Sequence, residues 1–316
     1  MAKKKKPEPE KKRHSHWWVV FIIIVVLLLF FMGCSVMIMS VGSGSEYTKS
    51  QGNVALIQIS GVLRTGSSSD FFAPEYASST KIIQKIRDAE NDASVKAIVL
   101  EINSPGGGAV ASYEVVNELK KSKKPTVSWI REVGASGAYW IATSTDYIIA
   151  NPMAVTGSIG VIGSYLEFGG LLERYNVTYT RLVSGKYKDI GTPYKELVPD
   201  EEAILQQKLD IIYNFFVKDV AANRNMEKDK VEELATGLFY LGVEAKDLGL
   251  IDQLGGEDEV KEYLKQEIGL ESVKFKKYYD KRTIWDVLGS VLQGASFNVG
   301  RGMASYLSQD SFTLRT

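Results

Sequence analysis

Histidine and cysteine are nearly absent from this sequence. Among 316 residues there are two histidines and one cysteine. A lone cysteine excludes an intramolecular disulfide, so the folded part must be stabilised by its hydrophobic core. A surplus of charge of one sign is also missing, because 38 basic residues balance 38 acidic ones to a formal net charge of +0. The basic residues are not gathered into one stripe, and nucleic acid is therefore not an expected partner.

Charge is missing altogether from Trp17 to Val41. As a helix, this run of about 25 residues would extend roughly 37 Å, enough to cross a membrane with some tilt. It follows a basic leader over residues 1–16. This order predicts a single-pass protein of the cell membrane, with a cytoplasmic N-terminus and an extracytoplasmic remainder. The run is too long for the apolar core of a cleaved signal peptide, and no A-x-A site follows it.

Two residue types in this region bear on chemistry. Cys34 follows Gly33, so a lipid attached to this cysteine is one interpretation, and a thiol inside the anchor helix is the simpler one. Both histidines, His14 and His16, lie in the leader, on the predicted cytoplasmic side. If the anchor is real, a Ser-His-Asp triad in the extracytoplasmic part is excluded. The remaining general bases are then carboxylates and lysine.

Beyond the anchor, predicted strands and helices alternate. We expect a polar linker over residues 42–52, one domain over residues 53–270 and a C-terminal tail over residues 271–316. Apolar runs predict strands at 53–61, 95–102, 127–130, 146–150 and 177–183, and strand-like structure at 156–163. Helical spacing of apolar residues predicts a helix at 79–91. Further helices are expected from the glycines at 106–108 to about 121 and at 200–223, and residues 65–78 are expected to form a loop. The alternation indicates an α/β fold with a largely parallel sheet and with functional residues at strand ends.

A serine between small residues lies at a predicted strand-to-helix junction. Ser136 stands in Gly-Ala-Ser-Gly-Ala-Tyr, residues 134–139. Small neighbours let a substrate approach closely, and a helix N-terminus behind the hydroxyl favours developing negative charge. Ser136 is therefore a candidate nucleophile. The alternative is that it is an N-cap residue of the following helix.

A second turn, Asn-Ser-Pro-Gly-Gly-Gly at residues 103–108, follows the predicted strand at 95–102. Its backbone amides could point at an oxyanion. Equally, glycine could stand there only for its backbone freedom. The turn lacks the lysine and threonine of a P-loop, so nucleotide binding is not expected.

The base for Ser136 would then be a lysine. A neutral lysine can accept a hydroxyl proton and later pass it to a leaving amine, provided that desolvation lowers its pKa. Lys186 and Lys188 flank Tyr187 just beyond the predicted strand at 177–183. Residues two apart on a strand share a face, so spacing does not choose between the two lysines. Either could also be an ordinary solvated surface charge.

Four motifs stand in order along the chain: Asn-Ser-Pro-Gly-Gly-Gly at 103–108, Gly-Ala-Ser-Gly-Ala-Tyr at 134–139, Thr-Gly-Ser-Ile-Gly-Val at 156–161 and Ser-Gly-Lys-Tyr-Lys-Asp at 184–189. Together they resemble the signal peptide peptidase A family, whose members are membrane-anchored Ser-Lys peptidases with a ClpP/crotonase-like fold. The resemblance runs over roughly residues 53 to 265. It implies that Ser136 is the nucleophile and Lys188 the base. It also implies backbone amides of Gly107 and Gly137 as oxyanion donors.

The resemblance has further implications and some departures. It implies remnant signal peptides in the membrane as substrates. The residue after Ser136-Gly137 is alanine where glycine is common in the family, and the chain carries one copy of a domain that some members carry twice. In single-copy members the serine and lysine of one site are thought to come from adjacent protomers of a ring, so a homo-oligomer is expected. No metal or organic cofactor is implied.

Two features leave alternatives open, and two rival functions remain. Ser158 could hydrogen-bond the lysine or the substrate, or it could satisfy a turn at a strand end. The apolar positions between Ile284 and Leu292 have helical spacing. They could pack on the domain or on a neighbour, touch the membrane surface, or reach the active site as an inhibitor.

The rival functions for the whole protein are a crotonase-like acyl-thioester enzyme and a non-catalytic scaffold for membrane proteins.

Overall fold

The computed structural model describes residues 17–18, 21–29, 52–66 and 76–278. The chain divides into two compact units, residues 1–49 and 50–316. In the first unit, residues 21–29 are helical and their side chains are exposed. Within the described residues, no helix has the length and apolar character needed to cross a membrane. Residues 30–41 of the predicted anchor, Cys34 among them, lie outside the described residues, as do both histidines and the segment from Ile284 to Leu292.

The second unit is built on an eight-stranded sheet of mixed α/β architecture. Six strands follow the order β10-β1-β4-β5-β6-β9, and all their pairings are parallel. β7 pairs parallel with β5 and antiparallel with β8. The strands are β1 (Val54–Ser60), β4 (Ala97–Ser104), β5 (Thr126–Ala135), β6 (Tyr147–Ala150), β7 (Val155–Gly157), β8 (Phe239–Leu241), β9 (Gln253–Leu254) and β10 (Phe275–Lys277). The prediction of a largely parallel sheet is therefore confirmed.

A second, very short sheet stands beside the first. It pairs β2 (Leu63–Arg64) with β3 (Ala77–Ser78). Residues 77–78 were expected in a loop, and the short strand forms because the amide of Ala77 donates to the carbonyl of Val62. A bridge between Leu63 and Gly107 connects this small sheet to the glycine turn after β4.

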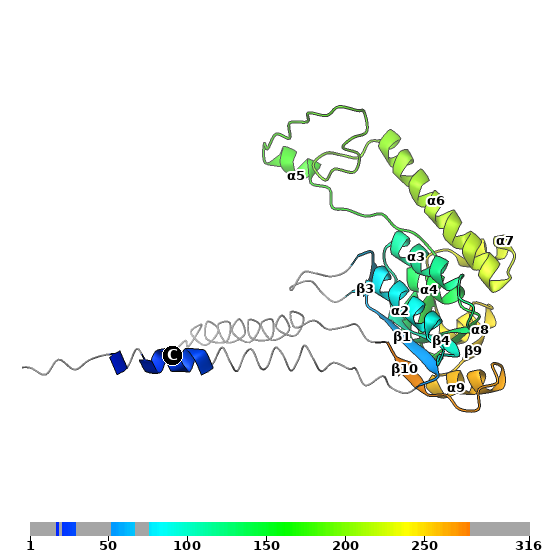
Figure 1. The fold of residues 1–316 in the computed structure, drawn as a ribbon. Coiled ribbons are helices and arrows are strands. Elements are labelled where there is room, and N and C mark those ends of the chain that lie inside the picture. Colours follow the sequence, from blue (N-terminus) through cyan, green and yellow to red (C-terminus); the bar gives the residue numbers. More distant parts are fainter. Residues whose placement is uncertain (1–16, 19–20, 30–51, 67–75, 279–316) are drawn as a thin grey trace, which may run out of the picture. The chain divides into compact units, whose positions relative to one another are not determined.

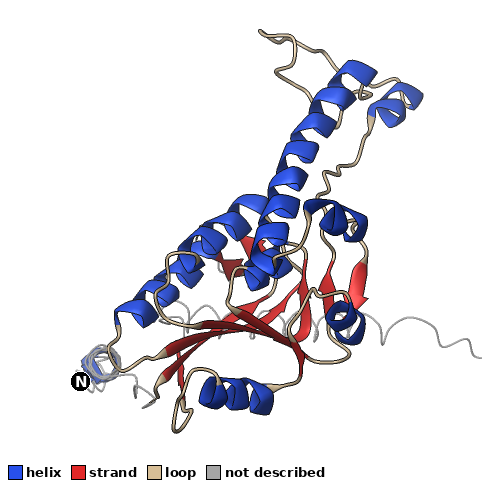
Figure 2. Ribbon diagram, turned by 90° about the vertical axis from the view of Figure 1, so that its right-hand side faces the viewer, coloured by secondary structure: helices blue, strands red, loops and turns tan. Residues whose placement is uncertain are grey.

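Helices cover both faces of the main sheet (Figures 1 and 2). The helices of this unit are α2 (Ser79–Asn91), α3 (Ala109–Leu119), α4 (Gly137–Thr143), α5 (Gly169–Arg174), α6 (Pro199–Arg224), α7 (Lys228–Leu234), α8 (Gly242–Asp247) and α9 (Glu257–Gln266). Of these, α5 lies away from the sheet (Figure 1). The predicted helices at 79–91, 109 to about 121 and 200–223 are confirmed to within a few residues.

The alternation of side chains along β1 produces two cores. Ala55, Ile57 and Ile59 face the larger core, together with residues of α2, α3, α4 and α6. Val54 and Leu56 face the smaller core, where α9 supplies Val260 and Leu264. Because successive residues of a strand point to opposite faces, a run of apolar residues such as 54–57 is expected in a strand covered on both sides.

Between β7 and α6 the chain leaves the sheet and forms a projecting segment, residues 164–198. Figure 1 shows α5 and its flanking loops beside the N-terminal end of α6, away from the sheet. Three ion pairs involve this segment: Arg181 with Asp189, and two with residues at the start of α6, Lys186 with Asp200 and Lys195 with Glu201. The strand predicted at 177–183 is wrong: these residues are neither helix nor strand, and their side chains are exposed. Their apolar pattern has no neighbouring strand to pair with in the described chain.

Candidate active site

Ser136 occupies a strained turn between β5 and α4. Its φ of 53° and ψ of −125° lie in a region that residues with a side chain rarely adopt. The amide of Ser136 donates to the carbonyl of Gly157 at 2.8 Å, and the hydroxyl of Thr156 donates to the carbonyl of Gly134 at 2.8 Å. β7 therefore fixes the turn from one side. Within the described structure the Ser136 side chain makes no cap hydrogen bond to α4, so the N-cap interpretation does not account for this residue.

The glycine turn after β4 lies directly against Ser136. A Cβ added at Gly106 would stand 2.7 Å from the amide nitrogen of Gly137 and 3.0 Å from the Cβ of Ser136. Gly106 and Gly107 have φ of 95° and 156°, values at which a side chain would be strained. This close approach brings the two motifs that the sequence singled out to the same place. The requirement for glycine is therefore one of space as well as of backbone conformation.

Two backbone amides at this junction are available to an anion. The amide of Gly137 belongs to the first residue of α4, where a helix offers no internal acceptor. The backbone of Leu63 donates a hydrogen bond to the carbonyl of Gly106 and accepts one from the amide of Gly108. Between them, the amide of Gly107 has no hydrogen-bond acceptor in the described chain. A Cβ on Gly137 would lie 3.5 Å from the nitrogen of Gly107. Two neighbouring amides of this kind can stabilise an oxyanion.

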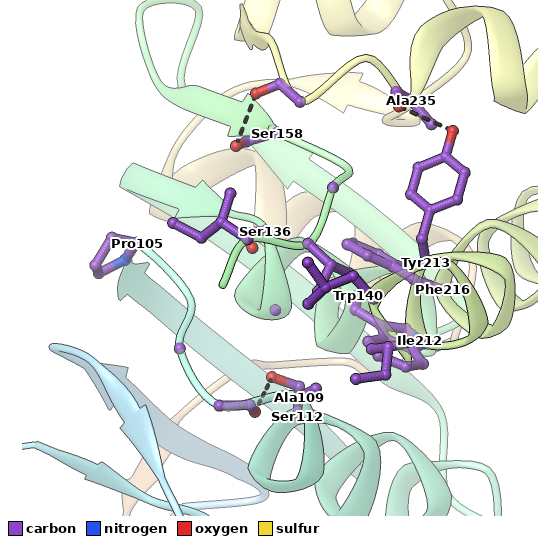
Figure 3. Close-up of a pocket in the computed structure, with 18 of the residues that line it drawn as sticks. Pro105, Ala109, Ser112, Ser136, Trp140, Ser158, Ile212, Tyr213, Phe216 and Ala235 are labelled. Atoms are coloured by element: carbon purple, nitrogen blue, oxygen red, sulfur yellow. Dashed lines mark hydrogen bonds between the residues drawn. The ribbon is translucent and has the colours of Figure 1, made fainter. Parts of the chain in front are cut away.

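Ser136 lines a cavity of about 690 Å³ (Figure 3). Its floor contains Gly107, Ser136, Gly137 and Ser158, and its apolar wall comes from Trp140 of α4 and from Leu209, Ile212, Tyr213 and Phe216 of α6. The size and the mainly apolar lining are those of a ligand-binding pocket. Among the residues that the structure describes, no cluster of three or more His, Cys, Asp or Glu side chains could hold a metal ion.

The wall from α6 is the part of the site that sequence reasoning missed. Ile212 and Phe216 are four residues apart and so lie on one face of the helix. Phe216 stacks on Trp140 with ring centroids 4.8 Å apart, and the Trp140 indole donates to Asp219 at 2.9 Å. The spacing of these residues was visible in the sequence. That they face Ser136 follows only from the fold.

Ser158 lines the same cavity at the end of β7. Its φ is 50°, its hydroxyl donates to the carbonyl of Gly237 at 3.2 Å, and its amide donates to the carbonyl of Leu238 at 2.9 Å. These bonds match the interpretation of Ser158 as a residue that satisfies a turn at a strand end. Its position in the cavity also leaves it within the reach of a bound substrate.

The two candidate lysines lie elsewhere. Lys186 and Lys188 are on the projecting segment, both are exposed, and neither lines the cavity. The ammonium of Lys186 stands 4.7 Å from the ring centre of Tyr187 and 3.8 Å from the carboxylate of Asp200. Its interaction with Tyr187, and to a lesser extent with Asp200, raises the pKa of Lys186. A raised pKa keeps this amine protonated, which is the opposite of what a general base needs. Among the residues that the structure describes, the cavity thus brings together Ser136, Gly107, Gly137 and Ser158 without a lysine.

Comparison with known proteins identifies the family. The profile of peptidase family S49 matches residues 118–271. A protein of Enterococcus faecium named "Putative signal peptide peptidase SppA" is 34% identical over 233 residues, which make up 73% of this chain and 68% of that protein. "Protease 4" of Salmonella typhi is 31% identical over 247 residues, 77% of this chain and 39% of that protein. "Serine protease SPPA, chloroplastic" of Arabidopsis thaliana is 34% identical over 179 residues, 56% of this chain and 26% of that protein. The chain belongs to peptidase family S49, the family of the SppA proteins, and is a serine peptidase.

Proposed function

We propose that this protein is a membrane-anchored endopeptidase in which Ser136 is the nucleophile and Lys188 the base. The observation that carries the proposal is the strained turn at Ser136, which opens into the cavity beside the amides of Gly107 and Gly137. A strained strand-to-helix turn exposes a serine hydroxyl in other hydrolases as well. The largely parallel sheet with helices on both faces agrees with a ClpP/crotonase-like fold, which we include in the proposal.

The proposed reaction is acyl transfer in two steps. The oxygen of Ser136 attacks the scissile carbonyl, and the hydroxyl proton passes to the neutral amine of Lys188. The carbonyl oxygen becomes an oxyanion that accepts hydrogen bonds from the amides of Gly107 and Gly137. The C–N bond breaks as Lys188 returns the proton to the leaving amine, which leaves an acyl-enzyme. Water then attacks this ester, with the lysine as base once more, and releases the acid and the free serine.

Lys188 would have to come from a neighbouring copy of the chain. It lies on the exposed projecting segment, and the cavity of its own protomer contains no lysine among the described residues. The projecting segment also exposes many apolar side chains, with Leu166 at 74% and Leu182 at 90%. Exposed apolar surface of this kind marks an interaction site. A head-to-tail contact that closes on itself gives a ring in which every serine meets a neighbour's lysine.

The proposed substrates are signal peptides that remain in the membrane after precursor processing. Three features support this choice: the name of the Enterococcus faecium relative, the apolar wall of the cavity, and the uncharged run at 17–41, which we propose as the anchor. Signal peptides are rich in apolar residues. An anchor next to the peptidase would raise the local concentration of such peptides at the site.

The central test compares the full chain, kept in mild detergent, with Ser136→Ala, Lys188→Ala and Lys186→Ala variants. The substrate is a fluorogenic peptide with an apolar residue before the cleaved bond, and each variant is also checked for oligomer size. We expect loss of activity in Ser136→Ala and Lys188→Ala and its retention in Lys186→Ala. Activity that survives Lys188→Ala and disappears in Lys186→Ala would move the base to the other lysine.

A mixture of two inactive variants tests the shared site. If Ser136 and Lys188 belong to adjacent protomers, a ring assembled from equal amounts of Ser136→Ala and Lys188→Ala chains contains interfaces with both residues intact. For random assembly these are about a quarter of all interfaces, so about a quarter of the activity should return. No recovery in rings shown to be mixed would contradict a site shared between protomers.

Covalent labelling separates the proposal from its rivals. A serine-reactive inhibitor such as a fluorophosphonate should modify Ser136, and mass spectrometry of the labelled peptide would locate the adduct. A crotonase-like thioester enzyme needs no nucleophilic serine, and a scaffold needs none either. Both rivals would be favoured if a folded oligomer showed neither labelling nor peptide cleavage.

A further inference from the structure

The hydroxyl of Ser104 is buried beside the glycine turn and takes no part in the reaction proposed above. Ser104 ends β4 and has no exposed surface. Its hydroxyl donates to the carbonyl of Gly61 at 2.6 Å and accepts a hydrogen bond from the amide of Gly106 at 3.1 Å. It therefore connects the turn after β1 with the turn that carries Gly107. Burial with both donor and acceptor in use indicates a fixed position for this hydroxyl.

The direction of the Gly107 amide is set by the peptide group that it shares with Gly106. Across a trans peptide bond the C=O and the following N–H point in opposite directions. The carbonyl of Gly106 accepts a hydrogen bond from the amide of Leu63 at 2.8 Å. The amide of Gly107 consequently points away from Leu63, and its nitrogen is close to Gly137 at the nucleophile turn. Any rotation of this peptide group would turn the proposed oxyanion donor away from the site.

The turn after β1 and the first residue of β2 hold the glycine turn at several points. The amide of Gly61 donates to the carbonyl of Asn103 at 3.2 Å, and the amide of Gly108 donates to the carbonyl of Leu63 at 2.8 Å. Both bonds join backbone groups, and Ser104 adds a side chain to this set. Glycine residues have no side chain with which to restrict their own backbone, so a turn with three of them depends on contacts from outside. The Ser104 hydroxyl supplies such a contact next to the peptide group between Gly106 and Gly107, which carries the proposed oxyanion donor.

We propose that Ser104 is a positioning residue of the peptidase, which orients the amide of Gly107 toward the oxygen of the scissile carbonyl. The proposal rests on the roles proposed above for Ser136 and Gly107. It assigns to Ser104 an effect on the transition state, where the oxyanion exists, and little effect on substrate binding. A residue that served only stability would change neither kcat nor KM in the folded enzyme.

The test measures kcat, KM and thermal stability for Ser104→Ala in the full chain. We expect kcat to fall by about 10- to 100-fold, as for the displacement of an oxyanion donor, with KM within about twofold of the parent. The Ki of a peptide aldehyde should rise in parallel with the loss of kcat, because its adduct with serine places an oxygen where the oxyanion forms. Ser104→Cys keeps the size of the side chain but has a weak donor, so we expect a smaller loss in the same direction. This second variant carries the test if the alanine variant does not fold.

The matched control is Ser128→Ala. Ser128 is also fully buried, and its hydroxyl accepts a hydrogen bond from Thr145 at 3.0 Å in the interior of β5. Ser128→Ala should lower the free energy of unfolding about as much as Ser104→Ala does, and it should leave kcat within about twofold of the parent. Equal effects of Ser104→Ala and Ser128→Ala on kcat would overturn the positioning role, as would a change confined to KM. If Ser136→Ala kept its activity, the proposed function itself would fail, and that result is separate from any result at Ser104.

Discussion

Replacing Gly106 by alanine would place a methyl group inside the backbone of the nucleophile turn. The added Cβ would stand 2.7 Å from the carbonyl oxygen of Ala135 and 2.7 Å from the amide nitrogen of Gly137. Neither atom belongs to a side chain that could turn aside. The substitution must therefore move one of the two turns, and either movement separates the amide of Gly107 from Ser136.

Two contributions determine the expected loss of stability. At a φ of 95° any residue other than glycine is strained, which costs about 1–3 kcal/mol. Overpacking against fixed backbone adds about 1–3 kcal/mol. The free energy of unfolding should therefore fall by roughly 2–6 kcal/mol. The variant that does fold should lose about 100-fold or more in kcat, an order-of-magnitude expectation for a displaced oxyanion donor.

Gly249 offers a control that contains the strain without the clash. Its φ is 77°, and a Cβ added there would find nothing within 4 Å. Gly249→Ala should therefore cost only the strain, about 1–3 kcal/mol, and should leave kcat unchanged. Urea unfolding followed by tryptophan fluorescence gives the free energies, and the fluorogenic peptide assay gives kcat.

The comparison of Gly106→Ala with Gly249→Ala tests whether the glycine turn packs closely on Ser136 and whether catalysis depends on this packing. An equal loss of stability in Gly106→Ala and Gly249→Ala, together with parental kcat in both, would refute the close packing of the glycine turn on Ser136. It would also remove the geometric basis for the two oxyanion donors. A larger loss of stability with parental kcat would keep the packing and refute its connection to catalysis.

Three further substitutions test a core side chain, a buried hydrogen bond and an ion pair. Phe216→Ala should lower the free energy of unfolding by about 3–5 kcal/mol, measured in urea, because Phe216 is buried and stacked; a loss under about 1 kcal/mol would contradict its burial. Tyr139→Phe should cost about 1–2 kcal/mol in the same assay, because its buried hydroxyl donates to the carbonyl of Leu250 at 2.8 Å, and an unchanged midpoint would argue against that bond. The ammonium of Lys276 holds the pKa of Asp92 below its ordinary value. The stability that this ion pair contributes is present above the ordinary aspartate pKa of about 4 and is lost as the pH falls toward the pKa of Asp92 in the folded protein. The urea midpoints of the parent and Asp92→Asn should therefore differ most near neutral pH and converge in acid.

The sequence allowed the elements that pack on both sides to be predicted. The strands at 54–60 and 97–104 each begin with a continuous apolar run of four residues, and the helix at 79–91 has apolar residues at helical spacing, so local pattern and tertiary burial agree. The strand expected at 177–183 failed because alternating apolar residues also occur on surfaces that face solvent or another molecule. A period of two specifies a strand only where a neighbouring strand supplies hydrogen bonds.

The candidate site was predictable in part for a related reason. Ser136 and the glycines at 106–108 follow the carboxyl ends of β5 and β4, which are neighbours in the parallel sheet, so their meeting follows from the topology. Leu63 and Ser104, which hold the glycine turn, act through backbone groups and one hydroxyl. Such contacts leave no recognisable signal in residue type or spacing, because nearly any residue could supply the backbone of Leu63. The distance of Lys188 from the cavity was equally invisible without the path of the projecting segment.

The place of β1 in the sheet has a consequence for how the chain folds. β1 lies between β4 and β10, and the amide of Lys274 donates to the side chain of Asn53 across 221 residues of sequence. During synthesis the backbone groups along one edge of β1 therefore remain unpaired until nearly the whole domain has been made. Long-range pairing of this kind is slow, and in the meantime the unpaired edge can pair with other chains and cause aggregation. A chain that stops before Phe275 would lack β10 and would keep that edge of β1 unpaired, so this sheet is complete only after β10 has been made.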